Sequence, residues 1–353
     1  MPGDGARFQT TLALILSGVA VATAAGVDLA ARAPRLAARV DAADRARFER
    51  GEELYVNRGN WLEFEDRLLL EEIPNADYAR GGVYFFGSSN LKWALKTWEL
   101  PPEERALIGN YGIGAISHSL EAQFIHFLVE KRGLGRAGDG RTAIVLGAFW
   151  SNGVNWEPET YFGPLWRRHR LYTYDETRGV DVPALDPLTR HWRMEKARCS
   201  GFLSGNANRL ARAVVLALGE PLDPTERMKD PEAMRAWILS HYANLDWRRP
   251  LSDQMRALGE LIDYLKERHI EVRIALLPRR AAFDEVPLDR AYRDEVTALA
   301  AARGVPLTDL SRLLAEDEFW DASHYNAAGL NKTHDALMRI ARDHLRAVGL
   351  IAP

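Results

Sequence analysis

The chain has 353 residues, of which 47% are hydrophobic, and this is enough for one large domain or two modest ones. Its formal net charge is −3, and the sequence has no basic cluster with interleaved aromatic residues, so we expect no nucleic-acid partner. The single cysteine, Cys199, excludes an internal disulfide and has no thiolate partner for a zinc site. We interpret it as a buried, inert thiol.

Residues 10–27, TTLALILSGVAVATAAGV, carry no charge and are close to the lower length limit for crossing a bilayer. Three interpretations are open: a membrane anchor, a signal peptide cleaved at the small residues ATAAG, and a soluble alanine-rich helix. The position at the N-terminus and the lack of a polar stripe favour a membrane-directed segment. An anchor is favoured over cleavage because a charged spacer follows directly.

Charges around this run bear on its orientation. Arg7 is the only positively charged side chain before it, whereas several arginines follow between residues 32 and 47. The positive-inside rule by itself would place the main domain in the cytoplasm, although large domains translocate despite such charges. We divide the chain into an anchor or signal segment (1–28), a charged helical stalk with a docking piece, WLEFEDRLLLEE (29–80), and a main domain (81–350).

Short apolar runs alternate with helical patterns in the main domain. Helices are predicted to follow Ser117 and to span 253–268, 288–303 (ended by Gly304) and 326–348. Strands are predicted at 82–87, 105–113, 142–149, 271–278 and 305–311. This alternation predicts an α/β fold, a three-layer α/β/α sandwich around a five-stranded parallel sheet. Residues 150–250, with six of the ten tryptophans and a helix near 204–218, interrupt it as an insertion between the third and fourth strands.

Polar residues that suit acyl chemistry follow these strands, at the edge where an open parallel sheet binds ligands. Ser89 follows the first strand, and Asp321 and His324 follow the last. A serine hydroxyl needs a base to take its proton, and histidine is the usual base because its pKa lies near neutrality. Asp321, three residues before His324, is placed to hold the imidazole in the correct tautomer.

Backbone and amide donors for a developing oxyanion are the second requirement of such chemistry. Gly112, after the second strand, would let its N–H face the site without a side chain in the way. After the third strand, Asn152 is a candidate for the second donor.

Together these blocks resemble the SGNH (GDSL-like) hydrolases: Gly-x-Ser on the first strand, Asn-x-Gly on the second, a Gly/Asn motif on the third and Asp-x-x-His near the C-terminus. The resemblance covers roughly residues 80–345. It implies a flavodoxin-like sheet, with Ser89 as nucleophile, Gly112 and an asparagine in the oxyanion hole, and Asp321 and His324 completing the triad. The sequence has no phosphate loop, metal cluster or dinucleotide fingerprint, so we expect no metal or cofactor. The third block departs from the family's Gly-x-Asn-Asp, because Phe149 stands where the asparagine would be, and Asn152 is the nearest substitute.

An N-terminal apolar run combined with FFGSSN also looks like the membrane-anchored DltD/AlgJ-type proteins of cell-envelope polymer acylation. That likeness implies an extracytoplasmic, periplasmic domain, or a secreted one if the run is cleaved, and an acylated small molecule or glycan as substrate. Two functions stay open: an ester hydrolase or O-acyltransferase that forms an acyl-serine, and a scaffold protein of envelope assembly that keeps the fold without the chemistry. The sequence does not indicate an oligomeric state.

Several residues have a structural interpretation beside the functional one. Ser88 is the rival nucleophile, although the family register favours Ser89. Trp150 is a candidate for stacking on a sugar ring, with core or lid packing as the alternative. Arg279 is a candidate for binding an anionic substrate, although a solvated pair with Arg280 on a loop is the simpler interpretation. His118 is predicted to be structural, and His334 and His344 are predicted to lie at the surface of the last helix.

Overall fold

The computed structural model describes residues 76–114, 116–138, 140–154 and 230–352, with Leu68, Ile73 and the short strands at 173–175 and 180–182. Its centre is a five-stranded sheet in the order β2-β1-β3-β6-β7, and every neighbouring pair is parallel. The strands are β1 (Gly82–Gly87), β2 (Ile108–Gly112), β3 (Thr142–Ala148), β6 (Glu271–Leu276) and β7 (Leu307–Asp309). The predicted α/β fold with a five-stranded parallel sheet is confirmed.

Burial explains why these segments form strands. Every residue of β1 and β3 is buried, as expected for continuous apolar runs in a parallel sheet that is covered on both faces. The edge strand β7 is partly exposed and only three residues long. The second and fifth strands were predicted too long: Arg105 belongs to α6, and the residues on either side of Leu307–Asp309 lie outside β7.

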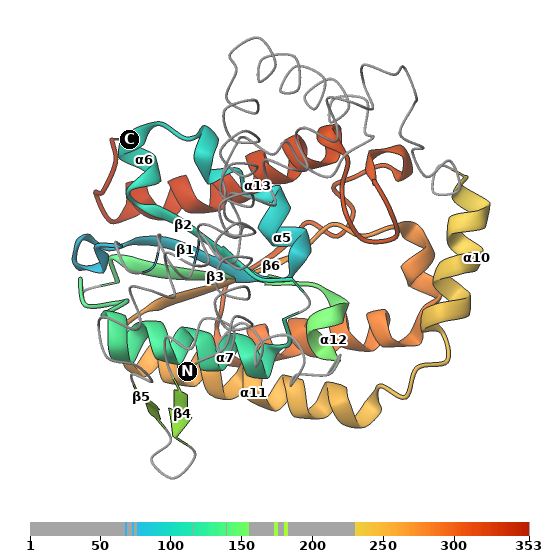
Figure 1. Ribbon diagram of the computed structural model, residues 1–353, viewed down its shortest axis with the longest axis horizontal. Helices are drawn as coiled ribbons and strands as arrows, with labels where there is room; N and C mark the ends of the chain where they lie inside the picture. The colour runs from blue at the N-terminus through green and yellow to red at the C-terminus, as the bar shows by residue number, and fades with distance from the viewer. Residues whose placement is uncertain are drawn as a thin grey trace, which may run out of the picture.

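Helices cover both faces of the sheet (Figure 1). The elements α5, α6 and α13 lie on one face, and α7, α11 and α12 lie on the other. The helical segments are η2 (Tyr78–Arg80), α5 (Ser89–Ala94), η3 (Thr97–Glu99), α6 (Pro102–Arg105), α7 (His118–Phe127), η4 (Leu128–Arg132), η5 (Trp150–Gly153), α10 (Pro231–Tyr242), α11 (Arg248–Glu267), η7 (Ala281–Glu285), α12 (Pro287–Arg303), η8 (Glu316–Glu318) and α13 (Ala327–Ala347).

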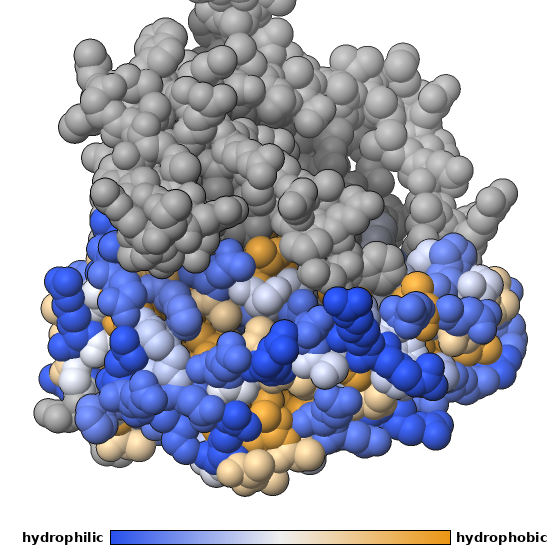
Figure 2. All heavy atoms as spheres, turned by 90° about the horizontal axis from the view of Figure 1, so that it is seen from below, coloured by the Kyte–Doolittle hydropathy of each residue, from blue (hydrophilic) through white to orange (hydrophobic). Residues whose placement is uncertain are grey.

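The long helix α11 shows how the hydrophobic pattern positions a helix on the sheet. It buries one stripe of side chains and presents charged residues outward, as an amphipathic helix does. The buried members of the stripe are Leu251, Met255, Leu258, Leu261, Ile262 and Leu265. Figure 2 views the molecule from the side of this helix, and the coloured part of its surface is mostly hydrophilic, with hydrophobic residues in small patches.

Helix ends follow the predicted signals in two places. Gly304 ends α12 in the left-handed conformation with φ of 60°, which glycine adopts without steric cost. Ser117 precedes α7 as its N-cap residue, although its side chain makes no capping hydrogen bond. These two positions fix the ends of helices that flank the sheet.

Part of the predicted organisation lies outside the described residues. This holds for residues 10–27, most of the stalk, Cys199, Trp156 and the helix near 204–218. From the stalk and docking segment, Leu68 and Ile73 are buried in the hydrophobic core. Within the predicted insertion, β4 (Thr173–Asp175) and β5 (Val180–Val182) pair antiparallel as a separate small sheet. Among the helices that the structure describes, none is long and apolar enough to cross a membrane.

Candidate active site

Three glycines stand side by side where the central strands end. Gly87 of β1 is in register with Gly112 of β2 and with Gly147 of β3. The order of the strands reverses around β1 and β3, and in such sheets a crevice opens at the carboxyl ends beside the reversal. The row of glycines matters because α5 starts directly above it. A Cβ at position 112 would lie 2.7 Å from the Lys92 Cα, so the glycine permits a close approach of the helix to the sheet.

Ser89 is the first residue of α5 and is partly exposed at this edge. Its N–H is in the first helical turn and therefore has no acceptor within the helix. Ser88, the rival nucleophile, is only 1% exposed, and its Oγ donates to Asn90 Oδ1 at 3.0 Å. The structure thus presents Ser89 and not Ser88 to an incoming substrate.

His324 and Asp321 meet Ser89 from the far end of the chain. His324 Nε2 lies 2.8 Å from Ser89 Oγ, and His324 Nδ1 lies 2.8 Å from Asp321 Oδ2. The predicted contacts between serine, histidine and aspartate are confirmed. With Nδ1–H donating to the carboxylate, Nε2 is left as the acceptor that faces the serine hydroxyl.

The Asp321 carboxylate also organises the backbone that carries the histidine. Its Oδ1 accepts the N–H of Ser323 at 2.8 Å and the N–H of His324 at 2.7 Å. Burial alone would raise the pKa of Asp321, but the hydrogen bond and charge of His324 and these two backbone N–H donors outweigh it and hold the pKa below its usual value. The carboxylate is therefore ionised in the folded protein near neutral pH.

A tight hairpin holds the aspartate and histidine together. The Trp320 N–H donates to the His324 carbonyl at 2.8 Å, and Phe319 forms an antiparallel bridge with Tyr325. The Tyr325 hydroxyl donates to the Pro278 carbonyl at 3.0 Å, which ties the hairpin to the segment after β6. We call residues 319–325 the histidine loop.

The two predicted oxyanion donors, Gly112 and Asn152, are both engaged in other hydrogen bonds. The Gly112 N–H donates to Asn110 Oδ1 at 3.1 Å. Asn152 is completely buried: its Oδ1 accepts the Phe149 N–H at 2.9 Å, and its Nδ2 donates to the Ile116 carbonyl at 2.9 Å. Asn152 therefore joins the turn after β3 to the segment after β2 and does not offer a free amide. The Ser89 N–H, at the start of α5, is the candidate donor that remains.

The two predicted substrate-binding residues are also buried. Trp150 is 4% exposed and packs in an aromatic cluster, with its ring centroid 4.7 Å from that of Tyr242 and 5.4 Å from that of Phe283. This matches the packing alternative and not an exposed stacking platform. Burial first, and then the negative charge of Asp321, raise the pKa of Tyr242 above its ordinary value.

Arg279 and Arg280 were predicted as a solvated pair or, for Arg279, as an anion-binding residue, and both interpretations are wrong. Each arginine is 3% exposed. Arg279 pairs with Asp284 at 2.5 Å and with Asp289 at 3.1 Å, and Arg280 pairs with Glu316 at 2.7 Å. Acidic partners contributed by later segments of the chain bury these cations, which leaves Arg279 without a role in binding substrate.

Three histidines with predicted structural or surface positions can be compared with their burial in the structure. His118 is buried between Glu121, at 2.9 Å, and the Tyr292 hydroxyl, at 2.8 Å, which fits the predicted structural role. His344 was predicted at the surface but is only 1% exposed, because it faces the sheet from α13. His334 is half-buried and accepts the Lys96 N–H at 3.2 Å.

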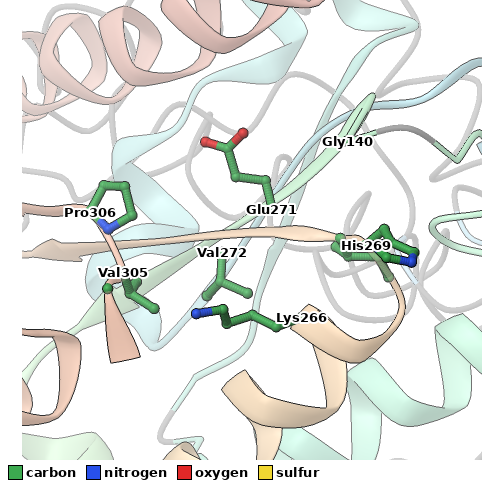
Figure 3. Close-up of a pocket in the computed structure, with 9 residues that line it drawn as sticks. Gly140, Lys266, His269, Glu271, Val272, Val305 and Pro306 are labelled. Carbon is green, nitrogen blue, oxygen red and sulfur yellow. The ribbon is translucent and has the colours of Figure 1, made fainter. Parts of the chain in front are cut away.

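A cavity of about 580 Å³ opens at the opposite edge of the sheet. It is lined by residues at the amino ends of β6 and β7, among them Lys266, His269, Val272 and Pro306 (Figure 3). With a rise of about 3.3 Å per residue, the six residues of β6 separate this cavity from the catalytic edge by most of the sheet's depth. The cavity is not the cleft of the triad. In the described part of the chain, no group of three His, Cys, Asp or Glu residues is placed to hold a metal ion.

Comparison with known proteins gives a limited result. No family model and no curated protein matches the chain. Among solved structures, the chain is similar to a GDSL-like lipase from Bacteroides thetaiotaomicron VPI-5482, at 10% identity and a TM-score of 0.41, over 80% of this chain and 99% of the other. It is also similar to a candidate acylhydrolase from Bacteroides fragilis NCTC 9343, at 13% identity and a TM-score of 0.38, over 79% and 94% of the two chains. Both names agree with the family that the motifs resemble, but scores this low carry no argument, so the assignment of a function rests on the geometry above.

Sequence reasoning missed two residues that touch the histidine loop. Asn90 follows the candidate nucleophile directly, and its Nδ2 donates to the Ser323 carbonyl. Arg280 Nε donates to the Asp321 carbonyl at 2.8 Å. The only signals in the sequence were an amide next to Ser89 and an arginine just after a strand, and neither signal identifies its partner.

Proposed function

We propose that this chain is an SGNH-type serine ester hydrolase or O-acyltransferase. One observation carries the proposal: the unbroken set of 2.8 Å contacts from Ser89 Oγ to His324 Nε2 and from His324 Nδ1 to Asp321 Oδ2. The sheet order and the position of each block at a carboxyl strand end support it.

The chemistry proceeds in two steps. His324 Nε2 accepts the hydroxyl proton of Ser89 while Oγ attacks the carbonyl carbon of an ester, and the carbonyl oxygen becomes an oxyanion. The intermediate collapses by breaking the bond to the alcohol oxygen, which takes the proton from His324 and leaves an acyl-serine. Water, or the hydroxyl of an acceptor, then attacks this ester with His324 again as base, and Ser89 regains its proton.

Each residue has a defined part in these steps. The Asp321 carboxylate stabilises the imidazolium that forms, and its depressed pKa keeps it charged throughout. The Ser89 N–H, at the positive end of α5, is the donor proposed for the oxyanion. Exclusion of water, which would separate a transferase from a hydrolase, depends on the shape of the segment between β3 and α10.

A scaffold without chemistry is the second candidate function. It is favoured by one observation, namely that the N–H of Gly112 and the amide of Asn152 are both engaged in other hydrogen bonds. A protein that only kept the fold would have no need of free donors at this position. The triad contacts argue against it, because nothing in a scaffold selects for a histidine held against a partly exposed serine.

The experiment that separates these candidates is reaction of the purified protein with a fluorophosphonate, with the modified residue identified by mass spectrometry. We expect a single adduct on Ser89, absent in Ser89→Ala and strongly slowed in His324→Gln. Ser88→Ala is the matched control, because it removes a neighbouring hydroxyl that is buried, and it should label like the wild type. Absence of any adduct on a folded protein would leave the scaffold function.

Turnover then separates hydrolysis from transfer. A p-nitrophenyl ester is supplied alone and with an added sugar alcohol, and the acylated products are measured. A hydrolase releases acid at the same rate in both mixtures, whereas a transferase makes the sugar ester at the expense of the acid. We propose an acylated envelope glycan as the natural class of substrate, on the strength of the motifs and the N-terminal run.

The location is a separate proposal, namely that residues 10–27 anchor the chain with the catalytic domain outside the cytoplasm. The full-length protein should stay with the membrane fraction after a high-salt wash, and a protein that starts near residue 40 should be soluble and keep its esterase activity. That start leaves in place Leu68 and Ile73, which pack in the core. A mature N-terminus near Gly26 would indicate cleavage and secretion.

A further inference from the structure

Two buried side chains from distant segments hold the histidine loop at its backbone. Asn90 Nδ2 donates to the carbonyl of Ser323, and Arg280 Nε donates to the carbonyl of Asp321 at 2.8 Å. Asn90 is 2% exposed and Arg280 is 3% exposed. The two carbonyls lie on either side of the turn that carries the Asp321 carboxylate and the His324 ring.

Arg280 is a rigid support, because its guanidinium is fixed by other contacts. Nη1 donates to Glu316 Oε2 at 2.7 Å and to the Glu316 carbonyl at 3.3 Å. The guanidinium carbon lies 5.0 Å from the centroid of the Phe319 ring, at the start of the histidine loop. A planar guanidinium that donates several hydrogen bonds loses little side-chain conformational freedom per bond and keeps a defined orientation. The Asp321 carbonyl therefore meets a donor that is also held by Glu316, outside the loop.

Asn90 joins the histidine loop to the nucleophile. It follows Ser89 directly in α5, and its Oδ1 accepts the hydroxyl of Ser88 at 3.0 Å, which fixes the side-chain amide. Its Nδ2 then reaches the carbonyl of Ser323, the residue before His324. One side chain thus connects the helix that bears the serine with the residue that precedes the histidine.

We propose that Asn90 and Arg280 are positioning residues that set the distance between His324 and Ser89. The proposal rests on the proposed function, since it assigns these residues to the geometry of that same triad. Neither side chain contacts Ser89 Oγ or the imidazole nitrogens, so both act through the backbone of the loop. Without them the hairpin keeps the bond from Tyr325 to Pro278 but loses its backbone hydrogen bonds to Asn90 and Arg280, so the turn that pairs Asp321 with His324 is no longer held in place.

The test compares Asn90→Asp and Arg280→Met with Arg279→Met as the matched control. Asn90→Asp keeps the size and the acceptor for Ser88 but places a carboxylate oxygen against the Ser323 carbonyl. Arg279 is an equally buried arginine, but its ion pairs go to Asp284 and Asp289 and not to the loop. The loss of a buried ion pair is therefore common to both arginine variants, and the contact with the loop is not.

Two readouts are used on folded protein. In ester hydrolysis, a shift of about 1 Å in the loop should lower kcat/KM by about 10²-fold, mainly through kcat. In proton NMR, the His324 Nδ1 proton that is shared with Asp321 gives a low-field signal, assigned by its loss in His324→Gln. We expect Asn90→Asp and Arg280→Met to lose both the rate and the signal, and Arg279→Met to retain both. If Arg280→Met does not fold, Arg280→Lys is used instead, because it keeps the charge without the planar guanidinium. If Asn90→Asp does not fold, Asn90→Ser is used instead.

The outcomes separate the two proposals. Wild-type rate and an unchanged low-field signal in Asn90→Asp and Arg280→Met would overturn the positioning role, as would equal losses in Arg279→Met. If the wild-type protein neither hydrolyses esters nor labels on Ser89, the proposed function fails, and the NMR signal still tests the positioning role by itself.

Discussion

Replacement of Gly112 by alanine should damage the candidate site more than the fold. A Cβ at this position would lie 2.7 Å from both the Cα and the N of Lys92 and 3.0 Å from its Cβ. The first two atoms are backbone of α5 and cannot rotate away. Carbon atoms in ordinary contact are about 3.5–4.0 Å apart, so the helix must retreat by roughly 1 Å.

The consequence for the site follows from the position of Ser89 at the start of that helix. Its Oγ is 2.8 Å from His324 Nε2, and the histidine loop is held by Arg280 to a different segment, so it does not follow the helix fully. A displacement of about 1 Å costs about 10²-fold in rate when reacting groups lose alignment. The stability cost of the extra methyl group is about 1–3 kcal/mol, which a domain of this size survives.

The assay measures kcat/KM on a p-nitrophenyl ester and stability by urea denaturation, with Gly147→Ala as the control. Gly147 belongs to the same row, but a Cβ there would meet its nearest atoms at 3.3 Å, two of them ends of leucine side chains that can adjust. We expect Gly147→Ala to keep most of the activity. A folded Gly112→Ala protein as active as Gly147→Ala would refute the argument that the glycine seats α5.

Three further predictions test single residues. Asn152→Ala should lower stability by about 1–3 kcal/mol, because two buried hydrogen bonds are lost, yet leave kcat within about tenfold, whereas a true oxyanion donor would cost about 10²–10³. Asp321→Asn should lower kcat by about 10⁴-fold. Because the pKa of Asp321 is lower in the folded protein than in the unfolded chain, the ionised carboxylate stabilises the wild type above the unfolded pKa, and this stability is lost as pH falls through the folded pKa; Asp321→Asn should lack it. Burial lowers the pKa of His334 to about 4, so the free energy of unfolding of the wild type should fall as pH falls from about 6.5 towards 4. His334→Asn can still accept the Lys96 N–H, and its free energy of unfolding, measured by urea denaturation, should change less with pH over that window. The same pH dependence in both proteins would contradict the assignment.

The sheet and the triad could be predicted because their signals are local and repeated. Continuous apolar runs define β1 and β3, and parallel strands bring their carboxyl ends to one edge, so the residues after them must converge. Ser89 and His324 are 235 positions apart in the sequence, yet the edge rule alone brings them into contact.

The oxyanion donors could not be predicted, because residue type does not reveal the hydrogen-bond partner. Asn152 was placed correctly after β3, but a turn of the backbone offers it the Phe149 N–H three residues back, and this local partner captures the amide. The Gly112 N–H likewise donates to the side chain of Asn110, two residues earlier. Local bonds of this kind form at short range and compete with any distant site.

The buried arginines were missed for the opposite reason. Arg279 and Arg280 look like a solvated pair on a loop, but their partners Asp284, Asp289 and Glu316 come from later segments that the tertiary fold brings together. Cations are rarely buried unless they are paired, and the sequence does not show the pairing. The interpretation of Trp150 had the same weakness, since its neighbours in the aromatic cluster come from α10 and η7.

The hydrogen bond between Gly112 and Asn110 leads to a last prediction. Asn110 Nδ2 donates to the carbonyls of Lys92 and Leu95 at 2.9 Å and 2.7 Å, so the side chain is locked and its Oδ1 keeps the Gly112 N–H. A phosphonate on Ser89 places a negative oxygen where the oxyanion would form, and charge-assisted bonds are about twice as strong as neutral ones. In a ¹⁵N spectrum we therefore expect the Ser89 amide proton to move strongly downfield on labelling, while the Gly112 amide stays in place. A Gly112 shift as large as that of Ser89 would show that the oxyanion draws this N–H away from Asn110, and would restore the glycine as a donor.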